Sequence, residues 1–122
     1  MLVSIDERDP LPPGEQLRSQ LVLLILSGTL AEGARLPSVR RLSADLKLAP
    51  GTVARVYKDL ETSGHLETSG SGTRVGYLGS RADQERRELL EDAARTFVQH
   101  ARRAGFQMTD AVAMIRRVYK VA

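Results

Sequence analysis

Residues 38–64 read SVRRLSADLKLAPGTVARVYKDLETSG, and the spacing of their apolar side chains determines the fold. Ser38 follows a proline and precedes apolar residues three and four positions apart, which predicts a helix over 38–46 with Ser38 as its N-cap. The next three residues are too few for anything but a tight turn. Pro50 suits the first turn of a second helix, which Gly64 is expected to end. Two short helices joined in this way form a helix-turn-helix.

The flanking segments extend this motif on both sides. Apolar residues recur on one helical face from Leu17 to Ile25, so a helix is predicted over 15–27. After the helix-turn-helix, residues 65–69 and 73–78 flank a glycine-rich turn of three residues, which predicts a β-hairpin. Three helices followed by a hairpin are the layout of a winged helix-turn-helix.

The two ends of the chain complete the expected organisation. Residues 2–5 fit a short strand, and the proline-rich stretch after them resists helix formation. The tail is predicted to form a long amphipathic helix over 82–104 and a last helix capped by Thr109. The fold class is therefore mainly α with a small β-hairpin wing. A winged helix-turn-helix, the DNA-binding candidate, is expected over 1–78, and a two-helix C-terminal dimerisation segment over 79–122.

Composition excludes several classes of function. The chain has 122 residues, no cysteine and two histidines, so thiolate zinc sites and cysteine nucleophiles are excluded, and no catalytic residue, metal or cofactor is predicted. Acidic residues between 83 and 92 alternate with arginines at helical spacing, which is typical of surface ion pairs. The longest apolar run, residues 21–26, is too short to span a bilayer, and the N-terminus lacks a signal-peptide pattern. We expect a cytoplasmic protein that is not an enzyme and has no membrane partner.

Positive charge is concentrated in the helix-turn-helix. The whole chain carries a net charge of +3, but residues 35–58 alone contain six basic side chains and one carboxylate. The core-facing stripe of the predicted second helix leaves Gly51, Thr52 and Arg55 at the start of its opposite face, where a recognition helix meets base edges. Arginine binds guanine through two hydrogen bonds, and threonine contacts thymine. An ordinary solvated surface fits the same pattern, and the helix alone does not separate the two interpretations.

A wider set of residues stands in a distinctive order over positions 28–75. The set consists of Gly33, Arg35, Leu36, Pro37, Ser38, Arg40, Leu42, Thr52, Val53, Leu60, Glu61, Gly64, Gly72 and Thr73. Together these residues resemble the winged-helix DNA-binding domain of GntR-type bacterial transcriptional regulators. The short tail and residues 50–57 resemble the YtrA-like subfamily. The resemblance implies a homodimeric repressor of an operon, often one encoding an ABC transporter, bound to a palindromic double-stranded DNA operator.

The resemblance also implies contact residues. Arg40 matches a backbone-binding arginine of the second helix, Thr52 matches a contact residue of the recognition helix, and 72–73 matches the wing. Lys47 stands where the family often has a glycine, at a modest conformational cost. Charge, helix face and resemblance together predict DNA contacts from Arg35, Ser38, Arg40, Arg41, Pro50, Gly51, Thr52, Arg55, Lys58, Ser71, Gly72 and Thr73.

Apolar stripes on the two tail helices predict a dimer interface. Two helices joined by a four-residue loop do not bury both stripes against each other alone, and a twofold dimer reads two half-sites. A tail that only stabilises a monomer stays open as the alternative. The residues expected in the interface are Leu90, Ala94, Phe97, Val98, Ala101, Val112, Ile115, Val118 and Tyr119.

Two other functions stay open at this point. One is a winged-helix module that binds protein, although the outward face of helix 50–63 lacks the aromatic and methionine anchors typical of such a surface. The other is a regulator that senses a small-molecule effector. The residues that fit either an apolar cleft for such a ligand or an ordinary core are Phe97, Phe106, Met108, Met114 and Tyr119.

Overall fold

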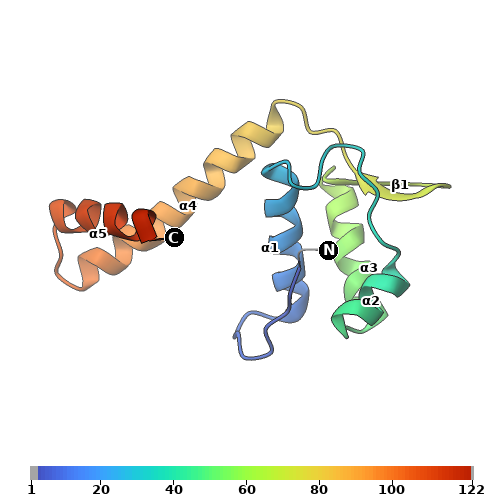
Figure 1. Ribbon diagram of the computed structural model, residues 1–122, viewed down its shortest axis with the longest axis horizontal. Helices are drawn as coiled ribbons and strands as arrows, with labels where there is room; N and C mark the ends of the chain where they lie inside the picture. Colours follow the sequence, from blue (N-terminus) through green and yellow to red (C-terminus); the bar gives the residue numbers. More distant parts are fainter. Residues whose placement is uncertain (1–2, 122) are drawn as a thin grey trace. The chain divides into compact units, whose positions relative to one another are not determined.

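The structure is a computed structural model, and it describes residues 3–121 as two compact units, divided between Arg86 and Arg87. The first unit is a small bundle of three helices with a two-stranded antiparallel hairpin (Figure 1). Its elements are α1 (Pro13–Leu26), α2 (Val39–Leu46), α3 (Pro50–Thr62), β1 (Leu66–Ser69) and β2 (Gly72–Val75). The tail consists of α4 (Arg81–Arg103), which begins in the first unit, and α5 (Met108–Val121).

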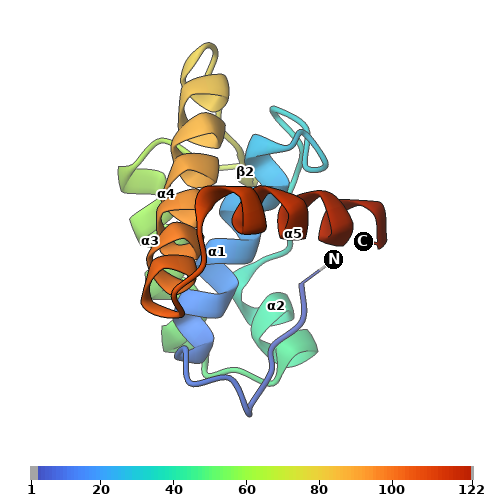
Figure 2. The same cartoon turned by 90° about the vertical axis from the view of Figure 1, so that its left-hand side faces the viewer.

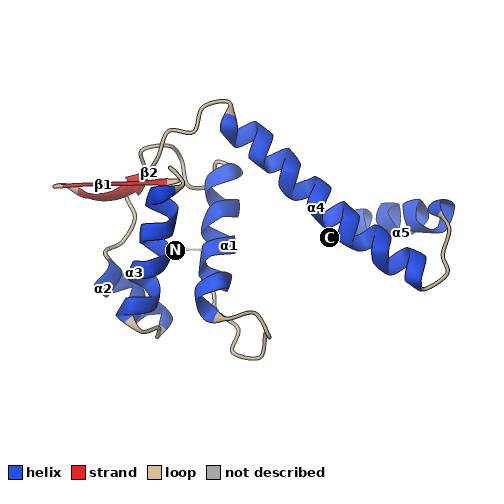
Figure 3. Cartoon of the chain, turned by 180° about the vertical axis from the view of Figure 1, so that it is seen from behind, coloured by secondary structure: helices blue, strands red, loops and turns tan. Residues whose placement is uncertain are grey.

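This element order confirms the predicted fold class. The described residues form a winged helix-turn-helix followed by a two-helix segment, and they are mainly helical (Figure 3). Helix α1 starts at Pro13, two residues before the predicted start, because proline is accepted in the first turn, where no helical partner exists for its missing N–H. Among these residues no helix is long and apolar enough to cross a membrane.

The core of the first unit is built around α3. One stripe of this helix is buried, and it consists of Val53, Val56, Tyr57 and Leu60, as the sequence spacing predicted. Leu17 and Leu21 of α1 and Leu42 of α2 belong to the same apolar cluster. Each fully buried side chain of this size contributes about 1.5–3 kcal/mol, so the cluster fixes how α1 and α2 lie against α3.

The helix-turn-helix is set by one cap and one turn. Ser38 Oγ accepts a hydrogen bond from the Arg41 N–H at 3.1 Å, which confirms Ser38 as the N-cap of α2. Lys47 closes α2 in the left-handed conformation, with φ 56° and ψ 43°. Between residues 3 and 121 it is the only non-glycine residue with a positive φ. The turn therefore places a lysine in a conformation that glycine adopts without steric cost.

The connector before α2, residues 33–37, pairs with the hairpin. The sequence did not predict this pairing. The Leu36 N–H donates to the Thr73 carbonyl at 2.9 Å, and the Val75 N–H donates to the Ala34 carbonyl at 2.8 Å. An isolated bridge also joins Arg35 and Arg74. The connector therefore runs along the edge of β2, held by one isolated bridge and backbone hydrogen bonds, and it links the wing to the start of the helix-turn-helix.

The hairpin differs from its predicted boundaries. Ser69 pairs with Gly72, so the turn has two residues, Gly70 and Ser71, rather than three. Gly72 already belongs to β2, and the second strand ends at Val75, before the predicted end at residue 78. The shorter turn is possible because Gly72 adopts φ +108°, which a residue with a side chain rarely reaches.

The N-terminal strand prediction is wrong over residues 3–5, and Leu2 lies outside the described residues. Side chains of α1 take the place of a partner strand. Gln20 accepts from the Ser4 N–H at 3.0 Å and donates to the Ser4 carbonyl at 2.7 Å. Gln16 makes the same pair of bonds with the backbone of Asp6, at 2.9 and 3.0 Å. The backbone is therefore satisfied without a sheet.

The predicted cap of the last helix is also wrong. Thr109 lies inside α5, which begins at Met108. The Asp110 carboxylate accepts a hydrogen bond from the Gln107 N–H at 3.0 Å, so it satisfies the helix N-terminus from the third helical position. A four-residue loop, residues 104–107, joins α4 to α5 (Figure 2). Its length is as predicted, but it begins one residue earlier because α4 ends at Arg103.

Polar contacts hold the first turns of α4 against the winged unit. His65 is buried, with Nδ1 2.6 Å from Ser63 Oγ and Nε2 3.2 Å from the Glu85 carboxylate of α4. Arg81 donates to the Ser63 carbonyl at 2.9 Å. These contacts explain why the start of α4 belongs to the first compact unit.

Replacement of Tyr57 by phenylalanine tests the link between α3 and the connector. The Tyr57 hydroxyl donates to the Pro37 carbonyl at 2.8 Å, so Tyr57→Phe should lower the free energy of unfolding by about 1 kcal/mol at neutral pH. Burial raises the pKa of Tyr57 to about 12 from its ordinary value of 10. As the pH rises above 10, Tyr57 therefore loses its hydroxyl proton in the unfolded chain before it does so in the folded protein. The free energy of unfolding of the wild type should then fall relative to that of the variant.

Urea unfolding of both proteins at pH 7 and between pH 9 and pH 11 measures this difference. The pH range below 10 serves as the control, because the tyrosine is protonated there in both states. A constant difference across the whole range would contradict the assigned burial of the hydroxyl.

Replacement of Lys47 by glycine tests the strain in the turn. A residue with a side chain in the left-handed conformation lowers the free energy of unfolding by about 1–2 kcal/mol. Glycine removes this strain, but it also makes the unfolded chain more flexible, which offsets part of the gain. We therefore expect Lys47→Gly to raise the free energy of unfolding by about 0.5–1 kcal/mol in urea unfolding. Lys47→Ala removes the same charge but keeps the strain, and it should not be stabilised. Equal effects of the two substitutions would assign the change to charge.

Candidate nucleic-acid interface

The side of α3 opposite the core is exposed and basic. Burial of the apolar stripe leaves Gly51, Arg55, Lys58 and Thr62 on the outward face, and all four are exposed. The charged groups of Arg55 and Lys58 make no hydrogen bond or ion pair with any other residue in the described range 3–121. This face therefore presents two free cations about one helical turn apart.

Thr52, which the sequence placed on this outward face, lies instead at its edge beside α1, and so does Asp59. Thr52 is half-buried, and its methyl group lies close to Gly14 of α1. A side chain added at Gly14 would place its Cβ only 3.3 Å from this methyl group. Asp59 is also half-buried, and its carboxylate lies 2.5 Å from Nη2 of Arg18 on α1. Helix α1 therefore covers one flank of α3, and the fully exposed stripe is narrower than the sequence alone indicated.

Helix α2 adds two further cations. Arg40 and Arg41 are exposed, and neither guanidinium is paired with another part of the chain that the structure describes. Ser38 is exposed as well, but its oxygen already accepts the capping hydrogen bond from the backbone of Arg41. The arginines are thus available to an anionic partner, whereas Ser38 has only its hydroxyl proton to offer.

The N-terminus of α3 is open. Ala49 is its N-cap and supplies no side-chain hydrogen bond, and Pro50 and Gly51 form its exposed first positions. The partial positive charge of this helix end is therefore not neutralised by a side chain of the cap.

Arg35 differs from the other predicted cations because it is engaged within the fold. Its Nη2 donates to the Ser71 carbonyl at 2.5 Å, which ties the connector to the turn of the hairpin. Ser71 Oγ lies 2.9 Å from Ser69 Oγ, and the Thr73 hydroxyl lies 3.2 Å from that of Thr68. The wing thus presents hydroxyl groups and backbone, and Arg35 holds its turn in place.

A groove between the start of α1, the turn before α3 and α3 itself brings together charged residues that the sequence did not connect. Its polar lining includes Glu15, Arg18, Lys47, Thr52, Arg55 and Asp59. Arg18 was not predicted as part of the site. The spacing of Glu15 and Arg18 indicates a pair within one helix, and their charges lie 3.4 Å apart, but the contact with Asp59 spans 41 residues and depends on helix packing.

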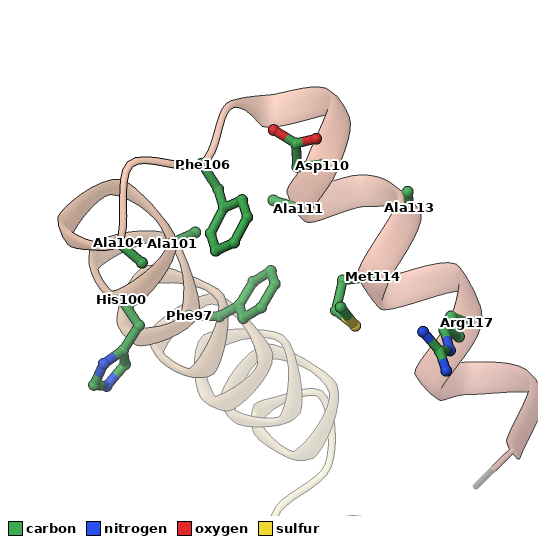
Figure 4. Close-up of a pocket in the computed structure, with 10 residues that line it drawn as sticks. All are labelled: Phe97, His100, Ala101, Ala104, Phe106, Asp110, Ala111, Ala113, Met114 and Arg117. Carbon is green, nitrogen blue, oxygen red and sulfur yellow. The ribbon is translucent and has the colours of Figure 1, made fainter.

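The residues predicted for dimerisation lie in the second unit. From Arg87 to Val121 no residue is buried, and several large apolar side chains are more than half exposed. Helices α4 and α5 enclose an apolar cleft in which the rings of Phe97 and Phe106 lie beside each other, with Met114 facing them from α5 (Figure 4). The fractional exposures of the most exposed members are Leu90 72%, Val118 57% and Tyr119 83%.

Comparison with known proteins places this arrangement in a family. Residues 13–75 match the family described as "Bacterial regulatory proteins, gntR family". The chain is 36% identical over 114 residues to the "HTH-type transcriptional regulator Rv1152" of Mycobacterium tuberculosis, an overlap that covers 93% of this chain and 91% of that protein. It is 40% identical over 75 residues to the "HTH-type transcriptional repressor YtrA" of Bacillus subtilis, covering 61% of this chain and 58% of that protein.

Solved structures share the fold. A "GntR family transcriptional regulator from Listeria monocytogenes" superposes with a TM-score of 0.80 at 23% identity, over 93% of this chain and 98% of that one. The structure titled "AraR(DBD) in complex with operator ORX1" superposes with a TM-score of 0.54 at 21% identity, over 61% of this chain and 96% of that one.

The chain therefore belongs to the GntR family of bacterial transcriptional regulators, and it is similar to YtrA-like members. This result confirms the resemblance inferred from the ordered residues of the helix-turn-helix and wing. The relatives are DNA-binding transcriptional regulators rather than enzymes.

Proposed function

We propose that the chain is a dimeric repressor that binds a palindromic operator through the outward face of α3. The observation that carries this proposal is the set of unpaired cations on one winged helix-turn-helix: Arg40 and Arg41 on α2, and Arg55 and Lys58 on α3. Unpaired basic side chains on a recognition helix and the helix before it suit phosphates and base edges. As the resemblance to the YtrA-like subfamily implies, the regulated genes form an operon, and an ABC-transporter operon is the first to test.

Each cation has a proposed role. Arg55 is central on the outward face and reads a guanine through a two-pronged hydrogen bond. Arg40, Arg41 and Lys58 contact phosphates, which position the protein without reading sequence. The open N-terminus of α3 at Gly51 adds a backbone contact to phosphate. The wing, through Ser71, Gly72 and Thr73, contributes less, because Arg35 is occupied in holding its turn.

Dimerisation through α4 and α5 is supported by their uncovered apolar side chains. A pair of helices that buries none of its side chains has little hydrophobic stabilisation of its own. A second copy would cover this surface and would present two recognition helices to two half-sites. The apolar cleft of Phe97, Phe106 and Met114 is then filled by the partner rather than by an effector.

The protein-interaction alternative lacks a comparable observation. A hot spot for protein binding is typically built from exposed aromatic residues near the centre of a surface. The exposed face of α3 carries glycine, arginine, lysine and threonine instead.

Fluorescence anisotropy tests the proposed function directly. The labelled duplex comes from upstream of the protein's own gene, a scrambled duplex is the control, and both are titrated at two salt concentrations. We expect tight, salt-sensitive binding of two protomers to the native duplex and much weaker binding to the scrambled one. Absence of binding to either duplex at low salt would overturn the proposal in favour of a protein-interaction module.

Alanine substitution of Arg55 should weaken specific binding by about 1–3 kcal/mol and relax the preference at one base pair in each half-site. The matched variant is Arg40→Ala, which removes the same charge from α2. It should weaken binding to specific and random DNA alike and lower the salt slope by about 1. Competition anisotropy with single-base operator variants measures both effects. An Arg55→Ala variant that loses affinity equally for all sequences would be a phosphate contact.

A charge placed on the exposed side of α5 should separate the dimer. Ile115→Glu introduces a carboxylate where the proposed interface requires an apolar side chain, and sedimentation velocity should show the monomer at concentrations where the wild type is dimeric. Gln107→Glu, in the exposed loop before α5, makes the same change of charge and should leave the dimer intact. Unchanged sedimentation of the Ile115 variant would exclude this face from the interface.

A further inference from the structure

We propose that Arg18 of α1 is a positioning residue that holds the Asp59 carboxylate away from Arg55 and so keeps Arg55 free to bind DNA. This inference rests on the proposed function, because it assumes that Arg55 faces the operator. It assigns a role in DNA recognition to a residue of α1, outside the helix-turn-helix.

Helix α3 does not make one charge pair that its residue spacing would allow. Arg55 and Asp59 are four residues apart on one helix, a spacing at which opposite charges are neighbours. Elsewhere in this chain the same spacing does form ion pairs: Arg81 lies 3.3 Å from Glu85, and Arg95 lies 2.7 Å from Glu91. Arg55 makes no ion pair with any described residue, so something prevents the expected contact.

Arg18 of α1 takes the place of Arg55 as the ion-pair partner of Asp59. Arg18 Nη2 lies 2.5 Å from Asp59 Oδ2 and 3.4 Å from Glu15 Oε1. All four charged side chains line the same groove between α1 and α3. Arg18 reaches Asp59 from the flank of α3 that α1 covers, and it draws the carboxylate toward that flank and away from the outward stripe.

The ion pair of Arg18 and Asp59 matters less for folding than for DNA binding. The side chains of Arg18 and Asp59 are 35% and 44% exposed, and partly exposed ion pairs contribute little to folding stability. The consequence for DNA binding is larger. A carboxylate released beside Arg55 would compete with the DNA for its guanidinium and would bring a negative charge close to the phosphates.

The experiment is a double-mutant cycle on the full chain, using a duplex that the wild type selects from a random pool. The variants are Arg18→Gln, Asp59→Asn and the combination of the two. The control is Arg8→Gln, which removes one positive charge from an exposed loop of the same unit. Circular dichroism verifies that each variant is folded.

We expect Arg18→Gln to weaken specific binding about three- to tenfold, and Asp59→Asn to leave it unchanged or tighter. The double variant should bind within about twofold of Asp59→Asn, since Arg18 has no function once the carboxylate is gone. If Arg18→Gln causes the same loss whether or not Asp59→Asn is also present, Arg18 contacts phosphate directly and the inference is overturned. The inference is also overturned if Arg18→Gln weakens binding neither alone nor together with Asp59→Asn. It is overturned too if Arg8→Gln weakens binding as much as Arg18→Gln does.

A crystal structure of the Arg18→Gln variant without DNA gives a second, independent test. We expect the Asp59 carboxylate within about 4 Å of the Arg55 guanidinium, the distance of an ion pair. If the two groups remain apart, the inference fails even where DNA binding is intact. If the wild type selects no duplex, the proposed function itself fails, and the two failures are therefore distinguishable.

Discussion

Helix α3 has to satisfy three surfaces at once, and the rest of the first unit depends on this constraint. Its apolar stripe is buried against α1 and α2, one flank is covered by α1, and the remaining side is exposed. A helix of 13 residues has fewer than four turns, so each surface is only one or two residues wide in any turn. The core contacts of Val53 and Leu60 therefore determine which way the side of α3 that carries Arg55 faces. A core substitution that rotates α3 would move its charged face as well.

The wing and the helix-turn-helix form one structural piece because the connector belongs to both. Residues 33–36 pair with β2 and lead directly to the cap of α2. Arg35 fixes the turn of the hairpin, and Arg74 donates to the Gly33 carbonyl at 3.2 Å. These side chains cross the junction in opposite directions. The two-stranded hairpin, which is marginal in isolation, is thereby stabilised by hydrogen bonds to the connector.

The sequence predicted the elements that local patterns specify and missed those that depend on distant contacts. Helix spacing, the Ser38 cap and the conformational cost at Lys47 are local features, and the structure confirms them. The missed features all join residues at least 10 positions apart in the sequence. They are the pairing of the connector with β2, the hydrogen bonds of the N-terminal segment with Gln16 and Gln20, and the ion pair of Arg18. Such contacts become visible only when α1 and the hairpin are placed in space. The charge pattern identified the cations of the candidate site, but not which of them the fold already occupies.

The uncovered tail has a consequence for local stability. Backbone hydrogen bonds of α4 beyond Arg87 and of α5 are not shielded by any buried side chain in the described part of that unit. In a single chain, opening of these helices would expose little additional apolar surface, so it would cost far less free energy than opening of the winged unit. In the monomer, amide protons of the two regions should therefore exchange with solvent on separate timescales, those of α5 long before those of α3. The monomer would then behave in solution as a stable winged unit joined to a tail whose helical order depends on the partner that covers it.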